Sequence, residues 1–214
     1  MRSTILLIVA SVLIAVGSDP VGLSQVKTSS ADATVTRFLD QHRGSWRDLN
    51  VPEADGRALY DTVIMGGYKR ALEIGTSTGH SGIWIAWALS KTGGRLITID
   101  IDEGRYREAL KNFKDAGVSA YVDARLADAH DLVAKLDGPF DFVFIDADKE
   151  WYTNYAKAVL PKLAVGGALT AHNVSQYGGR RQMTGGFYDY IRSLPNLETS
   201  FSAGVMVSRK RSEK

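Results

Sequence analysis

Two polar clusters follow short apolar segments of the chain and carry the residue types that acid–base or metal chemistry uses. His172 and Asn173 come directly after the apolar run Ala168–Ala171, and Asp146 and Lys149 follow an earlier apolar run. A carboxylate can bind a hard cation, an imidazole titrates near neutral pH, and a lysine with a lowered pKa can act as a base. These residues therefore predict a site for proton transfer, for a divalent cation, or for both.

A third cluster is rich in glycine and predicts a pocket for a nucleoside. In the segment LEIGTSTGHSG, which begins at Leu72, the backbone amides favour a negative group. Ser77 stands where the dinucleotide motif G-x-G-x-x-G has its second glycine, and a side chain there disfavours a pyrophosphate. Glu73 is placed to face a cationic amine, and Ser81 is placed to hold a carboxylate. This combination favours a cofactor made of a nucleoside and a small zwitterion.

Acidic residues after the next two predicted strands complete that pocket. Asp100 ends the segment RLITID, where a carboxylate can accept both hydroxyls of a ribose. The alternative for Asp100 is a cap of the following helix. Asp128 and Ala129 follow the next apolar segment, which is the expected place for adenine contacts, although a plain loop aspartate explains Asp128 almost equally well.

The elements that must position these residues alternate regularly from Arg70 onward. Amphipathic or apolar helical segments separate the predicted strands, and such alternation predicts a mostly parallel sheet with right-handed crossovers. The carboxyl ends of its strands then lie along one edge, where ligands bind. A closing hairpin over Leu197–Lys210, with a turn at Ala203-Gly204, adds antiparallel strands. The five preceding strands are predicted at 70–75, 95–100, 120–126, 140–146 and 167–171, and further helices at about 35–42, 53–65 and 186–194.

The beginning of the chain differs from the rest in composition. Residues 1–17 contain an apolar run of about 12 residues, from Ile5 to Val16, which suits a signal peptide and is short for a membrane span. A buried helix of the domain is the alternative. Residues 18–30 predict a linker and residues 31–214 a single domain. We therefore expect an exported or membrane-anchored protein, with any membrane contact confined to this segment; a misassigned start and a cytoplasmic location are the alternative.

Composition excludes several other classes of site and partner. The chain contains no cysteine, which excludes disulfides, thiolate zinc sites and cysteine nucleophiles. Its net charge of +2 argues neither for nor against nucleic-acid binding, because the basic residues are scattered apart from the tail Ser208–Lys214. We expect no nucleic-acid partner. A homodimer is compatible with the sequence.

Four segments in order resemble a known family, the cation-dependent O-methyltransferases related to caffeoyl-CoA and catechol O-methyltransferases. The segments are LEIGTSTGHSG, LITIDID, FDFVFIDADKEWYTNY and LAVGGALTAHNV, and the resemblance extends from about Val51 to Lys210. It implies an α/β, Rossmann-like class I methyltransferase fold, with a mostly parallel seven-stranded sheet and helices on both faces. It also implies S-adenosylmethionine as methyl donor and a divalent metal, usually magnesium, that orients two neighbouring substrate oxygens. By motif, the resemblance carries cofactor contacts to Val51, Glu73, Gly75, Thr76, Ser81, Asp100, Ala129 and Asp146, the first metal ligand to Asp146, and the base to Lys149.

The chain departs from this family at His172. The family's fifth strand ends in Asp-Asn, both of them metal ligands, whereas this chain has His172-Asn173. Magnesium binds imidazole poorly, so magnesium is disfavoured here. Three interpretations remain: His172 ligates manganese, iron or zinc together with Asp146 and Asn173; it is a general base in a metal-free site; or it is a buried histidine in a site that has lost activity.

The predicted function is S-adenosylmethionine-dependent methylation of a hydroxyl oxygen on a small molecule. His172 or Lys149 takes the proton of the acceptor. The alternatives are a nicotinamide-dependent oxidoreductase and a non-catalytic protein that binds S-adenosylmethionine. The loop Ser175–Gly185 is predicted to line the acceptor pocket, and its Arg180-Arg181 pair hints at an anionic acceptor.

Overall fold

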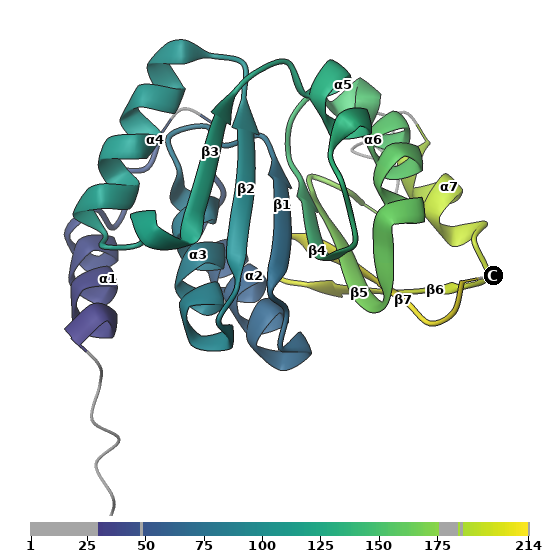
Figure 1. Ribbon diagram of the computed structural model, residues 1–214, viewed down its shortest axis with the longest axis horizontal. Coiled ribbons are helices and arrows are strands. Elements are labelled where there is room, and N and C mark those ends of the chain that lie inside the picture. The colour runs from purple at the N-terminus through teal and green to yellow at the C-terminus, as the bar shows by residue number, and fades with distance from the viewer. Residues whose placement is uncertain (1–29, 48, 176–183, 185, 214) are drawn as a thin grey trace, which may run out of the picture.

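A seven-stranded sheet runs through the domain in the order β3-β2-β1-β4-β5-β7-β6 (Figure 1). The computed structural model describes residues 30–47, 49–175, 184 and 186–213. The first five strands pair in parallel, and β7 is antiparallel to both of its neighbours. This confirms the predicted sheet with its closing hairpin. The strands are β1 (Arg70–Ile74), β2 (Arg95–Asp100), β3 (Val122–Leu126), β4 (Phe140–Ile145), β5 (Leu163–His172), β6 (Leu197–Ser202) and β7 (Val205–Lys210).

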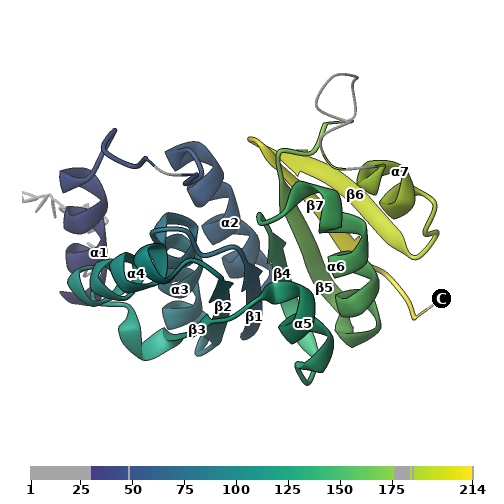
Figure 2. The same ribbon diagram turned by 90° about the horizontal axis from the view of Figure 1, so that it is seen from above.

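Helices cover both faces of this sheet, as the alternating pattern predicts (Figure 2). The α-helices are α1 (Ser30–Gln41), α2 (Glu53–Gly66), α3 (His80–Thr92), α4 (Glu103–Asp115), α5 (Ala129–Leu132), α6 (Tyr152–Val159) and α7 (Phe187–Arg192). Short 3-10 helices lie at η1 (Ser119–Tyr121), η2 (Val133–Lys135), η3 (Lys149–Trp151) and η4 (Leu160–Lys162).

The central strand β4 shows why the sheet is buried on both sides. Successive side chains of a strand point to opposite faces. Phe142 and Phe144 belong to a buried cluster with side chains of α2 and α3. Val143 and Ile145 belong to another buried cluster, with side chains of α6 and α7. A strand buried on both faces reads as a continuous apolar run, which is the pattern of this segment.

Several element bounds differ from the sequence prediction, those of strands β3 and β5 among them. Strand β3 begins at Val122, because the residues before it form the turn η1 after Gly117, which has a φ of +76°. Strand β5 extends further than predicted at both ends, so that His172 is its last residue. Asn173 then leaves the strand with a φ of +56°, in the left-handed region. His172 is therefore fixed by strand pairing.

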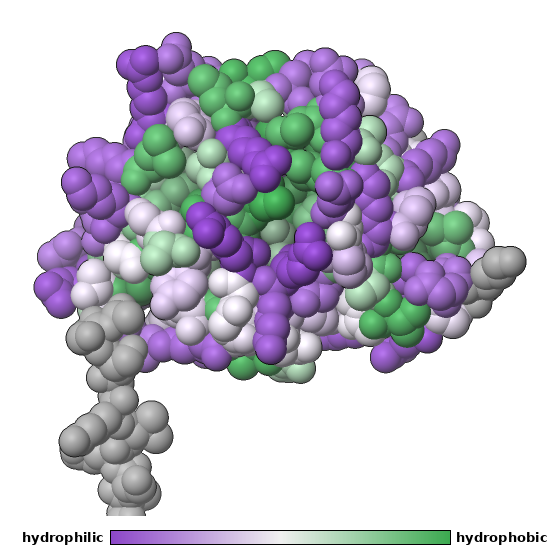
Figure 3. All heavy atoms as spheres, in the orientation of Figure 1, coloured by the Kyte–Doolittle hydropathy of each residue, from purple (hydrophilic) through white to green (hydrophobic). Residues whose placement is uncertain are grey.

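The predicted signal-like segment 1–17 and almost all of the predicted linker lie outside the described residues. Within the described part of the chain, no helix combines the length and apolar character needed to span a bilayer. On the face shown in Figure 3, hydrophilic residues form most of the surface and apolar patches are scattered among them, as is usual for a globular domain.

Candidate active site

A cavity of about 690 Å³ opens at the carboxyl ends of the parallel strands. It lies where ligands bind in sheets of this kind. Its wall includes residues that follow or end each of the five parallel strands, so the sheet edge brings together positions that are far apart in the sequence. The predicted site residues on this wall are Gly75, Asp100, Asp128, Ala129, Asp146, Lys149, His172 and Asn173.

Four other predicted cofactor residues are buried next to this wall instead of forming it. They are Val51, Glu73, Thr76 and Ser81. The predicted acceptor loop, residues 176–183 and 185, lies outside the described residues, and so does its arginine pair.

The position of Val51 depends on a buried histidine at the start of α3. His80 Nδ1 donates to the backbone oxygen of Val51 at 2.8 Å, and Trp84 Nε1 donates to His80 Nε2 at 3.0 Å. These two bonds assign the proton to Nδ1, and burial lowers the pKa of His80 to about 4. The neutral ring thereby holds the segment before α2, whose Leu49 and Asn50 form part of the cavity wall.

A chain of buried hydroxyls supports the glycine-rich loop from below. Thr98 donates its hydroxyl proton to Glu73 Oε2 at 2.6 Å and therefore accepts from Thr76, 2.6 Å away. Burial raises the pKa of Glu73 to about 8, against the opposing effect of hydrogen bonds from Ser81 and Thr98. Oε1 of the same carboxyl is buried and has no hydrogen-bond partner within the described residues. An isolated buried acceptor of this kind is costly unless a ligand completes it.

The loop itself requires glycine at its first position. Gly75 has a φ of +103°, and a Cβ there would lie 2.5 Å from the backbone oxygen of Asp146. Ser77 also has a positive φ, +48°, and its backbone N–H donates to Asp100 Oδ2 at 2.7 Å. Asp100 Oδ1 accepts the N–H of Asp102 at 2.9 Å, whereas Asp102 caps α4. Asp100 is therefore not the helix cap, and each of its oxygens keeps a lone pair for another donor.

The other end of the cavity is aromatic. Asp128 caps α5 by accepting the N–H of His130 at 2.9 Å. The His130 ring stacks on Tyr155, with centroids 5.7 Å apart, and lies 4.1 Å from the ring of Trp151. His130 and Tyr155, to which the sequence prediction gave no role, lie on the wall together with the predicted Asp128 and Ala129.

These features fit the predicted cofactor. The Glu73 oxygen that has no described partner suits a cationic amine. Gly75 has no side chain, so a ligand can approach its backbone closely. The remaining lone pairs of Asp100 suit two ribose hydroxyls. The stacked rings around His130 suit a flat base.

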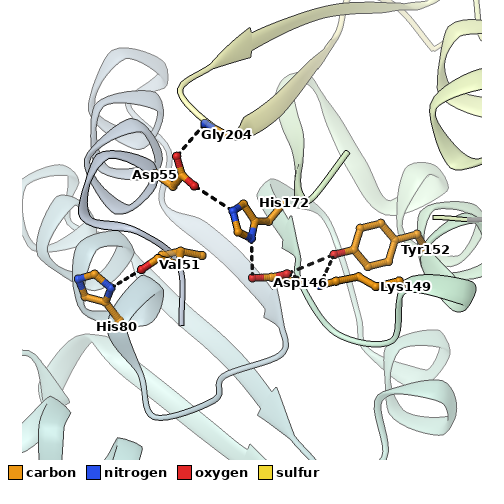
Figure 4. Close-up of polar contacts among 8 residues, drawn as sticks. All are labelled: Val51, Asp55, His80, Asp146, Lys149, Tyr152, His172 and Gly204. Atoms are coloured by element: carbon orange, nitrogen blue, oxygen red, sulfur yellow. Dashed lines mark hydrogen bonds and ion pairs between the residues drawn. The ribbon is translucent and has the colours of Figure 1, made fainter. Parts of the chain in front are cut away.

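His172 lies between two carboxylates (Figure 4). Its Nε2 is 2.9 Å from Asp55 Oδ2, and its Nδ1 is 3.2 Å from Asp146 Oδ2. Burial by itself lowers the pKa of His172, but the hydrogen bonds and charges of Asp146 and Asp55 outweigh it and raise the pKa. The two carboxylates therefore favour the protonated form of the ring and fix its orientation.

Asp55 is a site residue that the sequence prediction missed. It comes from the first turn of α2, and its Oδ1 accepts the N–H of Gly204 at 2.7 Å, in the turn between β6 and β7. The signal was a carboxylate next to apolar positions of a predicted helix, since Ala58 and Leu59 follow at helical spacing and are also buried. A charge is seldom buried without a partner.

Lys149 reaches the same carboxylate from another side. Its Nζ donates to Asp146 Oδ1 at 2.5 Å and to the hydroxyl of Tyr152 at 3.1 Å. Tyr152 in turn donates to Asp146 Oδ1 at 3.3 Å, and burial raises its pKa well above the ordinary value, so it stays a neutral phenol. Asp146 is thus in contact with His172, Lys149 and the hydroxyl of Tyr152.

Two of the predicted metal ligands, Asp146 and His172, lie next to each other, and both also have other partners. A neutral His172 ring that donates from Nε2 to Asp55 carries its lone pair on Nδ1, on the side of Asp146. One oxygen of Asp146 faces that ring, and the other accepts from Lys149. Among the described residues, no group of three or more His, Asp or Glu side chains is arranged to hold a metal ion.

Comparisons with known proteins show which family the chain resembles. The sequence model of a family described as O-methyltransferase matches residues 27–192. A catechol O-methyltransferase from Niastella koreensis is 42% identical over 134 residues, which is 61% of this chain and 60% of that protein. A flavonoid 3',5'-methyltransferase from Vitis vinifera is 33% identical over 146 residues, covering 65% and 61%. This chain thus spans about three fifths of the length of these two relatives.

Solved structures show the same relationship. An O-methyltransferase from Bacillus cereus in complex with S-adenosylhomocysteine has a TM-score of 0.69 and 28% identity, with 84% of this chain and 91% of that chain covered. The O-methyltransferase TomG from Streptomyces achromogenes, in complex with S-adenosylmethionine, has a TM-score of 0.69 and 25% identity, with 88% and 93% covered. Because the family model matches well over half of the sequence, this chain belongs to the O-methyltransferase family.

Proposed function

We propose that this protein transfers the methyl group of S-adenosylmethionine to a hydroxyl oxygen of a small molecule. The observation that carries the proposal is the convergence of eight predicted site residues on one cavity at the carboxyl edge of the sheet. The family and the donor-bound structural relatives support it. The cavity is of the size that small ligands use.

The residues around the glycine-rich loop are proposed to hold the donor. When bound, S-adenosylmethionine supplies an electrophilic methyl group on its sulfonium. Asp100 accepts the ribose hydroxyls, and Glu73 pairs with the amine through its unpartnered oxygen. The nicotinamide-dependent alternative loses support, because a pyrophosphate would meet the side chain at Ser77.

Lys149 is proposed to act on the acceptor. It lies on the cavity wall as an ammonium paired with Asp146, and an ammonium has no lone pair for a proton. In this state it favours the ionised form of an acceptor hydroxyl, whose proton passes to solvent, and it stabilises the oxyanion that attacks the methyl group. The predicted role of Lys149 as a base would require the neutral amine.

Methyl transfer to a panel of phenols, followed by mass spectrometry of the product and of S-adenosylhomocysteine, tests this function. We expect Lys149→Met to lower kcat about 100-fold and Lys149→Arg to retain part of the activity, because the cation is kept. Donor binding should survive both changes. A wild-type protein that binds the donor and methylates no hydroxyl compound would support the non-catalytic alternative.

A further inference from the structure

We propose that the edge of the domain at which the parallel strands begin rests on an anionic lipid surface. The contact is made by an exposed apolar turn at the end of α2 and by a basic cluster, Lys69, Arg70 and Arg95, next to the starts of β1 and β2. The sequence expectation confined membrane contact to residues 1–17, and the proposal extends it to the folded domain. It does not rest on the proposed methyl transfer, because lipid binding is measured without donor or acceptor.

The end of α2 exposes two large apolar side chains. Ile64 is 37% exposed and Met65 is 71% exposed. The helix stops directly after them, because Gly67 adopts a left-handed conformation and donates its N–H to the backbone oxygen of Ile64. A single exposed apolar side chain is ordinary, whereas neighbouring ones with charged residues beside them are a common feature of membrane contact sites. The end of α2 therefore provides an apolar tip.

The basic cluster lies directly after this tip in the sequence and is fixed by the sheet. All three side chains are exposed and line one surface hollow of about 440 Å³. The backbone N–H of Arg95 donates to the backbone oxygen of Lys69 at 2.7 Å, and Arg70 is the register partner of Arg95 in the β1–β2 pair. Among the described residues, no ion pair joins a member of the cluster to a carboxylate.

The acidic residues near the cluster do not cancel its charge. The carboxylate of Asp141 accepts two backbone N–H groups of the cluster, at 2.8 Å each. Asp123, which lines the same hollow, pairs with Arg125 at 2.9 Å. Asp137 contributes its backbone oxygen to Arg70 at 3.4 Å. Positive charge therefore remains in excess at this edge, and it attracts an anionic lipid surface.

The described chain also begins at this edge. Helix α1 starts at Ser30, at the same edge of the domain as the starts of β1 and β2 (Figure 1). The apolar run from Ile5 to Val16 precedes it, and the residues between the run and α1 span at most about 45 Å. A run held in a bilayer would keep this edge close to the lipid and so strengthen a weak contact. A lipid surface is thus the partner that accounts for the run, the tip and the cluster together.

This orientation leaves the active-site cavity accessible. Strands β1 and β2 have five and six residues and run from the proposed lipid edge to the edge that holds the cavity. At about 3.3 Å per residue, the two edges are roughly 17–20 Å apart. Soluble donor and acceptor molecules therefore reach the cavity while the opposite edge is on the lipid.

A fluorophore at the apolar tip tests the contact in the full chain. The chain has no cysteine, so a single introduced cysteine is labelled without background. We expect nitrobenzoxadiazole on Met65→Cys to shift its emission to the blue with vesicles that contain phosphatidylglycerol, and to be quenched by spin-labelled lipid. The matched control is Ile101→Cys, since Ile101 is 68% exposed and lies on the wall of the cavity. Its label should not be quenched by the lipid.

Three results of this measurement would overturn the proposal. The first is a full chain that does not sediment with the anionic vesicles. The second is a chain that sediments with them while lipid quenching at position 65 does not exceed that at position 101. The third is a blue shift at position 65 that appears without vesicles and grows with protein concentration, which would assign the tip to contact between copies of the chain.

Removal of charge tests the basic cluster. Lys69→Gln/Arg95→Gln should lower the partition coefficient of the full chain onto the anionic vesicles about 25-fold, about fivefold for each cation. Arg57→Gln/Arg107→Gln removes the same charge from exposed positions near the other edge and should change the coefficient less than about twofold. Equal losses in the two double variants would overturn the role of the cluster. If circular dichroism shows that the cluster variant does not fold, the quenching measurement decides the proposal.

Discussion

Asp100 offers the sharpest prediction about donor binding. Asp100→Ala should weaken the binding of S-adenosylhomocysteine about 30- to 900-fold, because it removes two charge-assisted hydrogen bonds to the ribose worth about 2–4 kcal/mol together. The carboxylate also accepts the N–H groups of Ser77 and Asp102, at 2.7 and 2.9 Å. The variant therefore releases the glycine-rich loop as well, which places the expected loss toward the upper end of the range.

Two further variants separate these contributions in isothermal titration calorimetry. Asp100→Asn keeps one acceptor oxygen and loses the charge, so its affinity should lie between the wild type and Asp100→Ala. Asp102→Ala removes only the cap of α4, where Asp102 accepts from Arg105 at 2.8 Å. It should lose about 1 kcal/mol of stability and keep its affinity. A folded Asp100→Ala that binds within threefold of the wild type would refute the reasoning.

The remaining predictions concern stability. Because burial raises the pKa of Glu73 from 4.5 to about 8, the folded chain keeps a proton that the unfolded chain loses, and the free energy of unfolding should fall as pH rises between these values. Glu73→Gln should remove this slope in thermal melts, and an unchanged slope would contradict it. His80→Phe should lower the free energy of unfolding, measured by urea denaturation, by about 2–4 kcal/mol, because Val51 and Trp84 lose their buried hydrogen-bond partner. A loss below about 0.5 kcal/mol would contradict this role of His80. A chain that starts at Ser18 should unfold cooperatively, and aggregation instead would mean that residues 1–17 belong to the core.

The alternation of strands and helices was enough to predict the sheet and the edge that holds the site. Asp100, Asp146 and His172 end or follow apolar strands, and parallel strands bring such positions together. The resemblance to a family then assigned roles to Asp100 and Asp146, and left three interpretations of His172 open. The boundary errors at β3 and β5 arose where propensity is weak, in an aromatic 3-10 turn and in a glycine-containing strand.

The partners of His172 were not predictable in the same way. Asp55 precedes it by 117 residues and lies on a different helix, so nothing in local spacing links the two. The sequence also did not predict which way the side chain of Glu73 points. A central strand is buried on both faces, and its pattern does not tell whether a polar side chain faces the ligand or the layer beneath the loop. Only the packed structure shows that Glu73 accepts from Thr98 with one oxygen and leaves the other without a described partner, and that His172 lies between two carboxylates.

The central claim is that the cavity at the sheet edge catalyses methyl transfer to oxygen. Incubation of the purified chain with methyl-labelled S-adenosylmethionine and a panel of phenols tests this most directly. The account predicts labelled methyl ether and S-adenosylhomocysteine in equal amounts, and loss of both in Asp100→Ala. A wild type that forms neither product, although it binds S-adenosylhomocysteine and although magnesium or manganese is then added, would contradict it.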